Sequence, residues 1–179
     1  PTTFVLAIAT CVIAMVLGVL LGILAANHQG TWIDSVLRVF GMAGVSMPIF
    51  WLGLLMILWF AVDLKWFPVS GWYGPKYLVL PALTMGLTFT ASLMRTTRSS
   101  MLDCIRQDYV ITARAKGQKE RVITYHHVFR NALIPIITAA GSAFGIALCG
   151  AVITEQVFSI PGLGNLMVNA ITTRDYPLV

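Results

Sequence analysis

Four uncharged, apolar stretches alternate with polar segments along the chain. They cover residues 3–26, 41–62, 77–94 and 131–154. About 20 predominantly apolar residues are needed for a helix to cross the hydrocarbon core of a membrane, so each stretch is long enough or nearly so. The pattern predicts an all-α, polytopic transmembrane helix bundle, with residues 1–179 in a single domain.

The segment 156–173 is uncharged as well, but its composition differs from that of the four stretches. Pro161 and Gly162 interrupt it, and Asn165 and Asn169 add polarity. These breaks favour a loop or short helix at the outer membrane face over a fifth span, so residues 155–176 are predicted to form an outer loop. Aromatic residues near the expected outer ends of the second and third spans are typical of interfacial anchors, with substrate stacking as the alternative: Trp66, Phe67, Trp72, Tyr73 and Tyr77.

Basic residues are concentrated in one polar loop, residues 95–130. This loop holds eight Lys and Arg residues and three acidic residues, and eight minus three gives +5, the formal net charge of the whole chain. The positive-inside rule therefore places the loop in the cytoplasm. Alternation of the spans then places residues 27–38 on the same side and residues 63–76 and 155–176 outside.

Gly117 divides the predicted cytoplasmic loop into two helical pieces. The first, residues 107–116, ends with a lysine followed by this glycine, which is a common way to terminate a helix. The second begins after residues 118–120 and runs toward Pro135. Steps of three and four place four of its apolar residues on one predicted face: Val122, Tyr125, Phe129 and Leu133. An amphipathic helix of this kind can dock, with one side on a partner and the other on its own bundle.

The sequence offers little other chemistry. Histidines occur at the expected membrane edges or in the basic loop: His28, His126 and His127. The cysteines have neither pairing nor metal-binding spacing: Cys11, Cys104 and Cys149. Glu155, at the outer end of the fourth span, is interpreted as an interfacial carboxylate, with contact to a binding protein or the exit of a pathway as alternatives. Because no Walker-type phosphate loop occurs, the chain is not expected to hydrolyse ATP, and no catalytic, metal or cofactor site is predicted.

Two other function classes remain as alternatives. An ion-driven secondary transporter usually carries ionisable residues within its spans, and the four apolar stretches have none. A membrane anchor subunit of a redox complex would need paired mid-span histidines or cysteines. Proton uptake or haem absorbance of the purified protein would favour one or the other. A nucleic acid partner is not expected.

Several motifs, taken together, resemble one family. They are ARAKG at 113–117, HVFRNA at 127–132, PIFWLG at 48–53, FPVSG at 67–71, LPALT at 80–84, VFSIPGLG at 157–164 and RDYP at 174–177. The first two resemble the cytoplasmic coupling signature of binding-protein-dependent ABC importer permeases. The whole set resembles the first of the two paired membrane subunits of the dipeptide/oligopeptide/nickel group. Ile111-Thr112-Ala113 stand where the general signature has Glu-Ala-Ala, a departure typical of the peptide group.

The resemblance implies a multi-pass permease subunit of the bacterial plasma (inner) membrane. It would form half of a translocation pathway for small peptides or a nickel chelate, and peptide is favoured because no cluster of metal ligands is visible. The implied partners are a second permease subunit, two cytoplasmic ATPase subunits that hold ATP and Mg, an extracytoplasmic substrate-binding protein and the lipid bilayer. A first span before Pro1 and a last span after Val179 are also implied, so the chain is interpreted as a fragment.

The resemblance also implies which residues couple the permease to the ATPase subunits: Ala113, Arg114, Ala115, Lys116, Gly117, Gln118, Lys119, Glu120, His127, Arg130 and Asn131. Gly117 would provide the tight bend, and Ala113 and Ala115 would leave room for close contact. The cations Arg114, Lys116 and Lys119 would pair with acidic groups of the ATPase, and His127 would orient the coupling helix. The alternative for the cations is that they satisfy the topology and anionic lipid headgroups.

Overall fold

The regular elements of the computed structural model, which describes residues 2–175, are all helical. In chain order they are α1 (Thr2–Asn27), α2 (Trp32–Ser46), α3 (Ile49–Met56), the π-helical segment η1 (Ile57–Asp63), α4 (Pro75–Ile105), α5 (Asp108–Ala115), α6 (Glu120–Val122), the π-helical segment η2 (Ile123–Val128), α7 (Phe129–Val157) and α8 (Leu163–Thr173). Three helices are long and apolar enough to cross a membrane, or four if a bent pair counts as one span. The predicted all-α membrane bundle is therefore confirmed.

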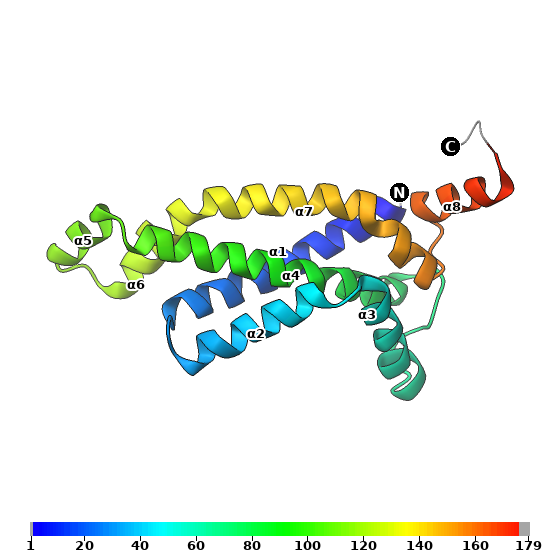
Figure 1. Ribbon diagram of the computed structural model, residues 1–179, viewed down its shortest axis with the longest axis horizontal. Helices are drawn as coiled ribbons and strands as arrows, with labels where there is room; N and C mark the ends of the chain where they lie inside the picture. Colours follow the sequence, from blue (N-terminus) through cyan, green and yellow to red (C-terminus); the bar gives the residue numbers. More distant parts are fainter. Residues whose placement is uncertain (1, 176–179) are drawn as a thin grey trace.

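The bundle is organised around the pair α1 and α4, whose contact is the most extensive between helices of the described residues and which run parallel to each other (Figure 1). Gly18 and Gly22 allow this approach. A Cβ at Gly22 would lie 2.5 Å from the Cβ of Thr97, and one at Gly18 would lie 2.9 Å from the Cβ of Leu93. Small residues at such crossings let helix backbones come close within lipid. Helix α7 packs against both members of the pair.

The two ends of the bundle have different compositions. One end, called here the basic end, contains the ends of α1 and α4, the start of α2, and the region from α5 to η2. The other, called the aromatic end, contains the start of α1, η1, the start of α4 and α8 (Figure 1). Each end has its own cluster of buried apolar side chains, centred on Met101 and Ile136 at the basic end and on Met85 and Ile160 at the aromatic end.

The structure differs from the expected continuous span over residues 41–62. Helix α2 begins earlier, at Trp32, and ends at Ser46; α3 and η1 then leave at an angle of 102°. Met47 is extended, with φ −80° and ψ 127°, because the proline that follows it disfavours helical geometry. Pro48 thus divides the stretch, and α3 projects sideways from the bundle in Figure 1.

The other apolar stretches lie within longer helices than their composition predicted. Helix α4 continues eleven residues past Met94, to Ile105, because Thr97 and Met101 remain buried against the bundle although arginines lie beside them. The helix that contains residues 131–154 already begins at Glu120, through α6 and η2. The predicted outer loop contains the short helix α8. Residue 176 of that loop, and Tyr176-Pro177 of the last motif, lie outside the described residues.

Candidate coupling site

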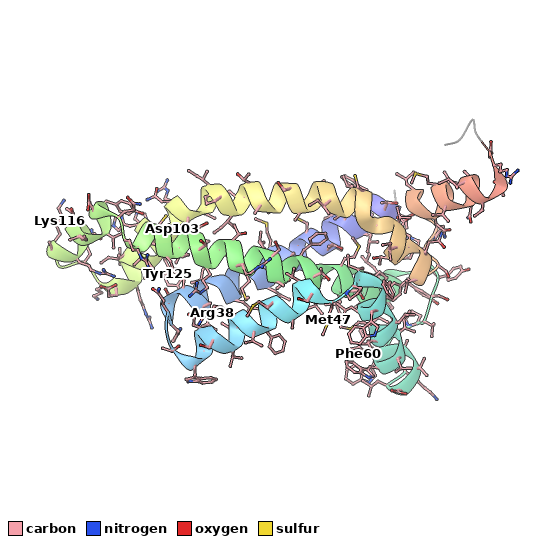
Figure 2. All side chains as sticks on the ribbon, in the orientation of Figure 1. Arg38, Met47, Phe60, Asp103, Lys116 and Tyr125 are labelled. Atoms are coloured by element: carbon pink, nitrogen blue, oxygen red, sulfur yellow. The ribbon has the colours of Figure 1, made fainter. Side chains whose placement is uncertain are left out.

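The candidate coupling residues lie on a helix–turn–helix that extends the basic end of the bundle. Helix α5 follows α4 after a two-residue connection, and α6 with η2 leads back into α7. Figure 1 shows this segment beyond the ends of α1 and α2, and Figure 2 shows Lys116 at its tip. The segment is therefore joined directly to both α4 and α7, two of the longest helices of the bundle.

Gly117 forms the turn, as the sequence predicted. Its φ of +74° is the left-handed conformation, which side chains with a Cβ rarely adopt. The Gly117 N–H donates to the Arg114 carbonyl at 2.9 Å, and the Gln118 N–H donates to the Ala113 carbonyl at 3.3 Å. These two bonds satisfy carbonyls that would otherwise be left free at the end of α5. A Cβ at Gly117 would meet nothing within 4 Å, so the requirement for glycine is conformational within this chain.

A charged pair closes the turn. Arg114 Nε lies 2.8 Å from Glu120 Oε1, and Arg114 Nη2 lies 3.3 Å from Glu120 Oε2. Their hydrogen bond raises the pKa of the Arg114 guanidinium and lowers the pKa of the Glu120 carboxyl. Both side chains are exposed, so the pair contributes little to stability. Arg114, which was expected to face acidic groups of an ATPase, is therefore already paired within the chain.

A second polar contact joins the two helical pieces. The Nε2 of His127 lies 2.7 Å from Oε1 of Gln118, and the Nδ2 of Asn131 donates to the His127 carbonyl at 3.0 Å. Because a carboxamide oxygen can only accept, this geometry puts the proton on Nε2 of His127. The bond holds the Gln118 side chain, just past the turn, against the start of α7.

Four buried side chains anchor the segment on the bundle: Val110, Ala113, Ile123 and Val128. The predicted apolar face is wrong for its first half, because Val122 and Tyr125 are exposed, whereas Phe129 packs against the apolar cluster as expected. The π-helical segment η2 is the reason: its wider turn places Ile123 and Val128, five residues apart, on the buried side. A count in steps of three and four cannot anticipate that shift.

The structure separates the expected coupling residues into an inward and an outward set. Ala113 is only 6% exposed and packs in the apolar cluster of the basic end, so the expectation that it leaves room for a partner is wrong. It shares a helix face with Val110, three residues earlier. The others point outward or lie at the rim: Arg114, Ala115, Lys116, Gly117, Gln118, Lys119, Glu120, His127, Arg130 and Asn131.

Sequence reasoning missed a buried ion pair near the same end. The carboxylate of Asp34 on α2 is 1% exposed and receives Nε and Nη2 of Arg98 at 2.7 and 2.8 Å. The Gly30 N–H donates to the same carboxylate at 3.2 Å. In the sequence, Arg98 is one of the basic residues that indicate a cytoplasmic loop, and nothing marks it as paired. The one hint of the pair is Asp34, the single acidic residue in the predicted cytoplasmic segment 27–38.

Glu155 is a second residue that the sequence reasoning placed incorrectly. It is fully buried, not an interfacial carboxylate. Thr3 donates its hydroxyl to Oε1 at 2.6 Å, and the Asn165 N–H donates to Oε2 at 3.0 Å. Gly162, at the N-cap of α8, has no side chain to accept the Asn165 N–H, so Glu155 caps the helix from α7. This carboxylate joins α1, α7 and α8 at the aromatic end.

Comparison with known proteins agrees with this architecture. Residues 18–179 match the family described as the binding-protein-dependent transport system inner membrane component. The chain belongs to this family. It is therefore a multi-pass component of a bacterial inner membrane, and the resemblance found in its motifs is confirmed.

Individual relatives cover the whole of this chain. It is 40% identical to the di/tripeptide transport system permease protein of Pseudomonas aeruginosa over 100% of its length, and to the glutathione transport system permease protein of Escherichia coli over the same share. It is 37% identical to a probable peptide ABC transporter permease protein of Sinorhizobium fredii over 99% of its length. The chain spans 58 to 62% of the length of these relatives.

Proposed function

We propose that this chain forms part of a permease subunit in an ATP-driven importer of small peptides. Together with a second permease subunit it forms half of a translocation pathway, and the segment from α5 to η2 docks on cytoplasmic ATPase subunits. An extracytoplasmic binding protein delivers the cargo at the aromatic end. ATP and Mg are bound and used by the ATPase subunits, not by this chain.

The observation that carries this proposal is the exposed helix–Gly117–helix at the basic end. Its anchoring side chains are few and apolar, whereas Lys116, Lys119 and Arg121 are exposed and form no ion pair within residues 2–175. Exposed cations on a short projecting segment complement an acidic groove on another protein. The family match supports the same role.

The connections of the segment explain how movement of the ATPases would reach the membrane. Helix α5 is linked to α4 by residues 106–107, and η2 runs into α7 without a break. Since α4 and α7 also pack against each other, a displacement of the segment moves both helices together. The buried Asp34–Arg98 pair adds α2 to the moving group.

Peptide is the favoured cargo. The relatives with 37 to 40% identity are named for di/tripeptides, peptides and glutathione. Within the described residues, three or more His, Cys, Asp or Glu side chains do not gather anywhere that would hold a metal ion. A nickel chelate is the second cargo class to test. The binding protein, not the permease, would select the cargo, so the lack of a metal site in the described residues does not decide against nickel.

The test uses the full-length protein, assembled with its partner permease, ATPases and binding protein in proteoliposomes. ATP hydrolysis is recorded during addition of di- and oligopeptides, glutathione and nickel chelates. The proposal expects hydrolysis to rise with peptides, and only in the presence of the binding protein. Stimulation by nickel chelates alone would show that a nickel chelate, not a peptide, is the cargo. Failure to assemble with any ATPase would contradict the coupling role.

A further inference from the structure

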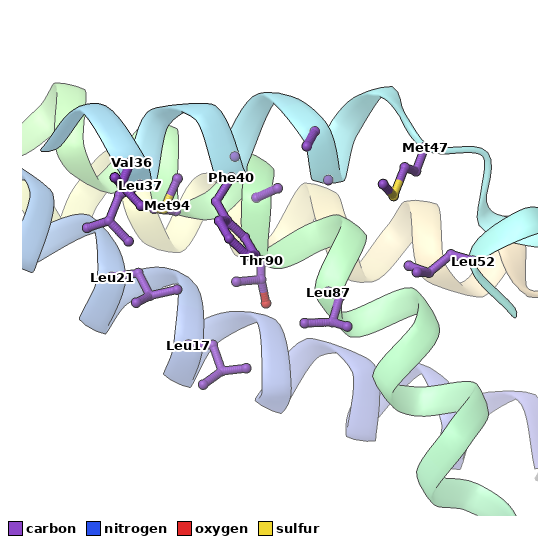
Figure 3. A pocket seen from close by; sticks show the side chains of 14 residues that line it. Leu17, Leu21, Val36, Leu37, Phe40, Met47, Leu52, Leu87, Thr90 and Met94 are labelled. Atoms are coloured by element: carbon purple, nitrogen blue, oxygen red, sulfur yellow. The ribbon is translucent and has the colours of Figure 1, made fainter. Parts of the chain in front are cut away.

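A cavity of about 480 Å³ lies between α1, α2 and α4 (Figure 3). Its walls include Leu17 and Leu21 of α1, Phe40 of α2 and Leu87 of α4. Among its described lining residues, Thr90 has the one polar side chain, and its hydroxyl is buried without a hydrogen-bond partner. Met47, in the turn where α3 leaves the bundle, lines the end of the cavity that is farther from the basic end.

This lining favours a hydrocarbon occupant. Cavities of roughly 300–1,000 Å³ are typical of small-molecule sites, so the space is large enough for part of an acyl chain. Two of the three helices around it, α1 and α4, are themselves membrane-spanning by length and composition. A polar solute would lose its hydration and find a single hydroxyl in return, which is unfavourable.

Two arginines flank the part of this cavity that is nearest to the basic end. Arg95 follows the lining residue Met94 on α4, and Arg38 follows the lining residues Val36 and Leu37 on α2. A Cβ at Gly41 would lie 3.9 Å from Cγ of Arg95, so the stem of Arg95 passes over the cavity rim. Figure 2 shows Arg38 toward the basic end of α2 and Met47 toward the other.

Both guanidinium groups retain donors for a ligand. Arg95 is exposed and forms no side-chain hydrogen bond or ion pair with the described part of the chain. Arg38 is 49% exposed in its side chain and lies 3.7 Å from Asp34, whose carboxylate Arg98 already binds at 2.7 Å. Arginine binds phosphate oxygens with paired N–H donors, so this pair complements an anionic headgroup.

We propose that the cavity binds an acyl chain of an anionic phospholipid, and that Arg38 and Arg95 hold its phosphate. The apolar walls match the acyl chain, and the basic side chains at one end match the phosphate headgroup. In a membrane leaflet the headgroup lies at the surface and the acyl chain points inward, which is the same arrangement. Basic pockets between membrane helices recognise anionic headgroups in this way. The lipid would also fill the space that separates α2 from α1, and so hold α2 at the position where Asp34 meets Arg98.

The experiment measures lipid binding to the full-length protein in nanodiscs of phosphatidylcholine with increasing phosphatidylglycerol. Native mass spectrometry counts the lipids that stay bound. The double variant Arg38→Gln/Arg95→Gln is expected to weaken retention of phosphatidylglycerol about tenfold and to leave phosphatidylcholine unchanged. Arg106→Gln, an exposed arginine at the end of α4 outside the cavity rim, is the matched control and is expected to bind as the unaltered protein does.

A second pair of variants tests the cavity itself. Ala43→Phe adds a large side chain to the lining, whereas Met42→Phe adds one on the neighbouring exposed position that is not part of it. Only Ala43→Phe should reduce phosphatidylglycerol retention. Equal phosphatidylglycerol retention in both variants would show that the lipid contacts only the arginines and does not enter the cavity, which would overturn the proposal. Retention that is indifferent to Arg38 and Arg95, or a cavity already filled by another helix of the full-length protein, would overturn it as well.

This inference is independent of the importer role, because lipid binding needs neither ATPases nor cargo. Loss of ATPase association with intact phosphatidylglycerol retention would contradict only the proposed function. Absence of lipid selectivity in an active importer would contradict only the lipid site.

Discussion

The two ends of the bundle each carry an appended helical segment, and the two are held in opposite ways. At the basic end, the links across the Gly117 turn are the exposed pairs Arg114–Glu120 and Gln118–His127. At the aromatic end, a fully buried carboxylate, Glu155, fixes α8 through the Thr3 hydroxyl and a backbone N–H. Polar contacts in water are individually weak, whereas breaking a buried hydrogen bond leaves its donor or acceptor unsatisfied at a larger cost.

This difference indicates which segment is prepared to exchange partners. The exposed groups at the Gly117 turn can be replaced by groups of another protein at little cost. The Glu155 cluster cannot open without leaving buried polar groups without hydrogen-bond partners. We therefore expect the basic end to be the place of regulated docking and the aromatic end to be fixed internally. Substitutions at the two ends should differ accordingly.

The largest effect is expected at Gly162. A Cβ there would overlap the carboxylate of Glu155, and that side chain has little room to move because it is fully buried and hydrogen-bonded. Gly162→Ala should lower the free energy of unfolding by about 4 kcal/mol, from overpacking and lost hydrogen bonds. Unfolding of the full-length protein in detergent measures it. Gly145→Ala, where a Cβ meets nothing within 4 Å, is the control, and equal stabilities of the two would contradict the buried cluster.

The next effect is expected at Glu155 itself. Glu155→Ala removes the acceptor for both hydrogen bonds and leaves a void, at a cost of about 3 kcal/mol. Glu155→Gln keeps one oxygen for the Asn165 N–H and should cost about 1 kcal/mol. Maleimide labelling of a cysteine placed at the buried Ala170 of α8 reports the opening. Identical labelling of Glu155→Ala, Glu155→Gln and the protein that retains Glu155 would show that Glu155 does not hold α8.

A smaller effect is expected at Gly117. Gly117→Val forces a β-branched residue into a left-handed conformation and should destabilise the turn by about 1–2 kcal/mol. Asparagine tolerates that conformation, so Gly117→Asn serves as the conformational control. Hydrogen exchange of the segment 108–122 measures the local opening. Fast exchange in both variants, or in neither, would contradict a purely conformational role for this glycine.

The smallest effect is the pH dependence of the turn. The pKa of Glu120 is lowered by its hydrogen bond to Arg114, so the pair is intact above the usual carboxyl pKa of about 4.3 and is lost as pH falls through the lowered value. The Nε–H resonance of Arg114, which donates to Glu120, should therefore shift only in strongly acidic solution. The Glu120→Gln variant should show no such step. A step near neutral pH would assign the change to another group.

The sequence predicted most of the architecture because membrane spans depend on long, uncharged runs that are visible in one dimension. It also located the Gly117 turn, since a lysine followed by glycine has a local structural meaning. Three features escaped it for physical reasons. The π-helical segment at 123–128 changes the helical period, the buried pair Asp34–Arg98 joins residues 64 positions apart, and Glu155 meets Thr3 across 152 positions. Local pattern carries no record of such long-range partners.

Two pairs of glycines, each four residues apart, show the same limit. Gly18 and Gly22 of α1 face α4 closely, whereas Gly141 and Gly145 of α7 have nothing within 4 Å in front of them. Both pairs have the same spacing in the sequence. Spacing alone therefore identifies a surface that permits close approach, and the fold decides whether a helix of this chain uses it.

Site-specific photocrosslinking in cells tests the docking of the basic end most directly. A photoreactive residue replaces Lys119 at the tip of the Gly117 turn, or Asn169 on α8 as the matched position at the aromatic end, in the full-length protein expressed with its ATPase subunits. Docking of the basic end predicts a crosslink from position 119 to an ATPase subunit and none from position 169. Crosslinks to the ATPase from position 169 but not from position 119 would contradict it.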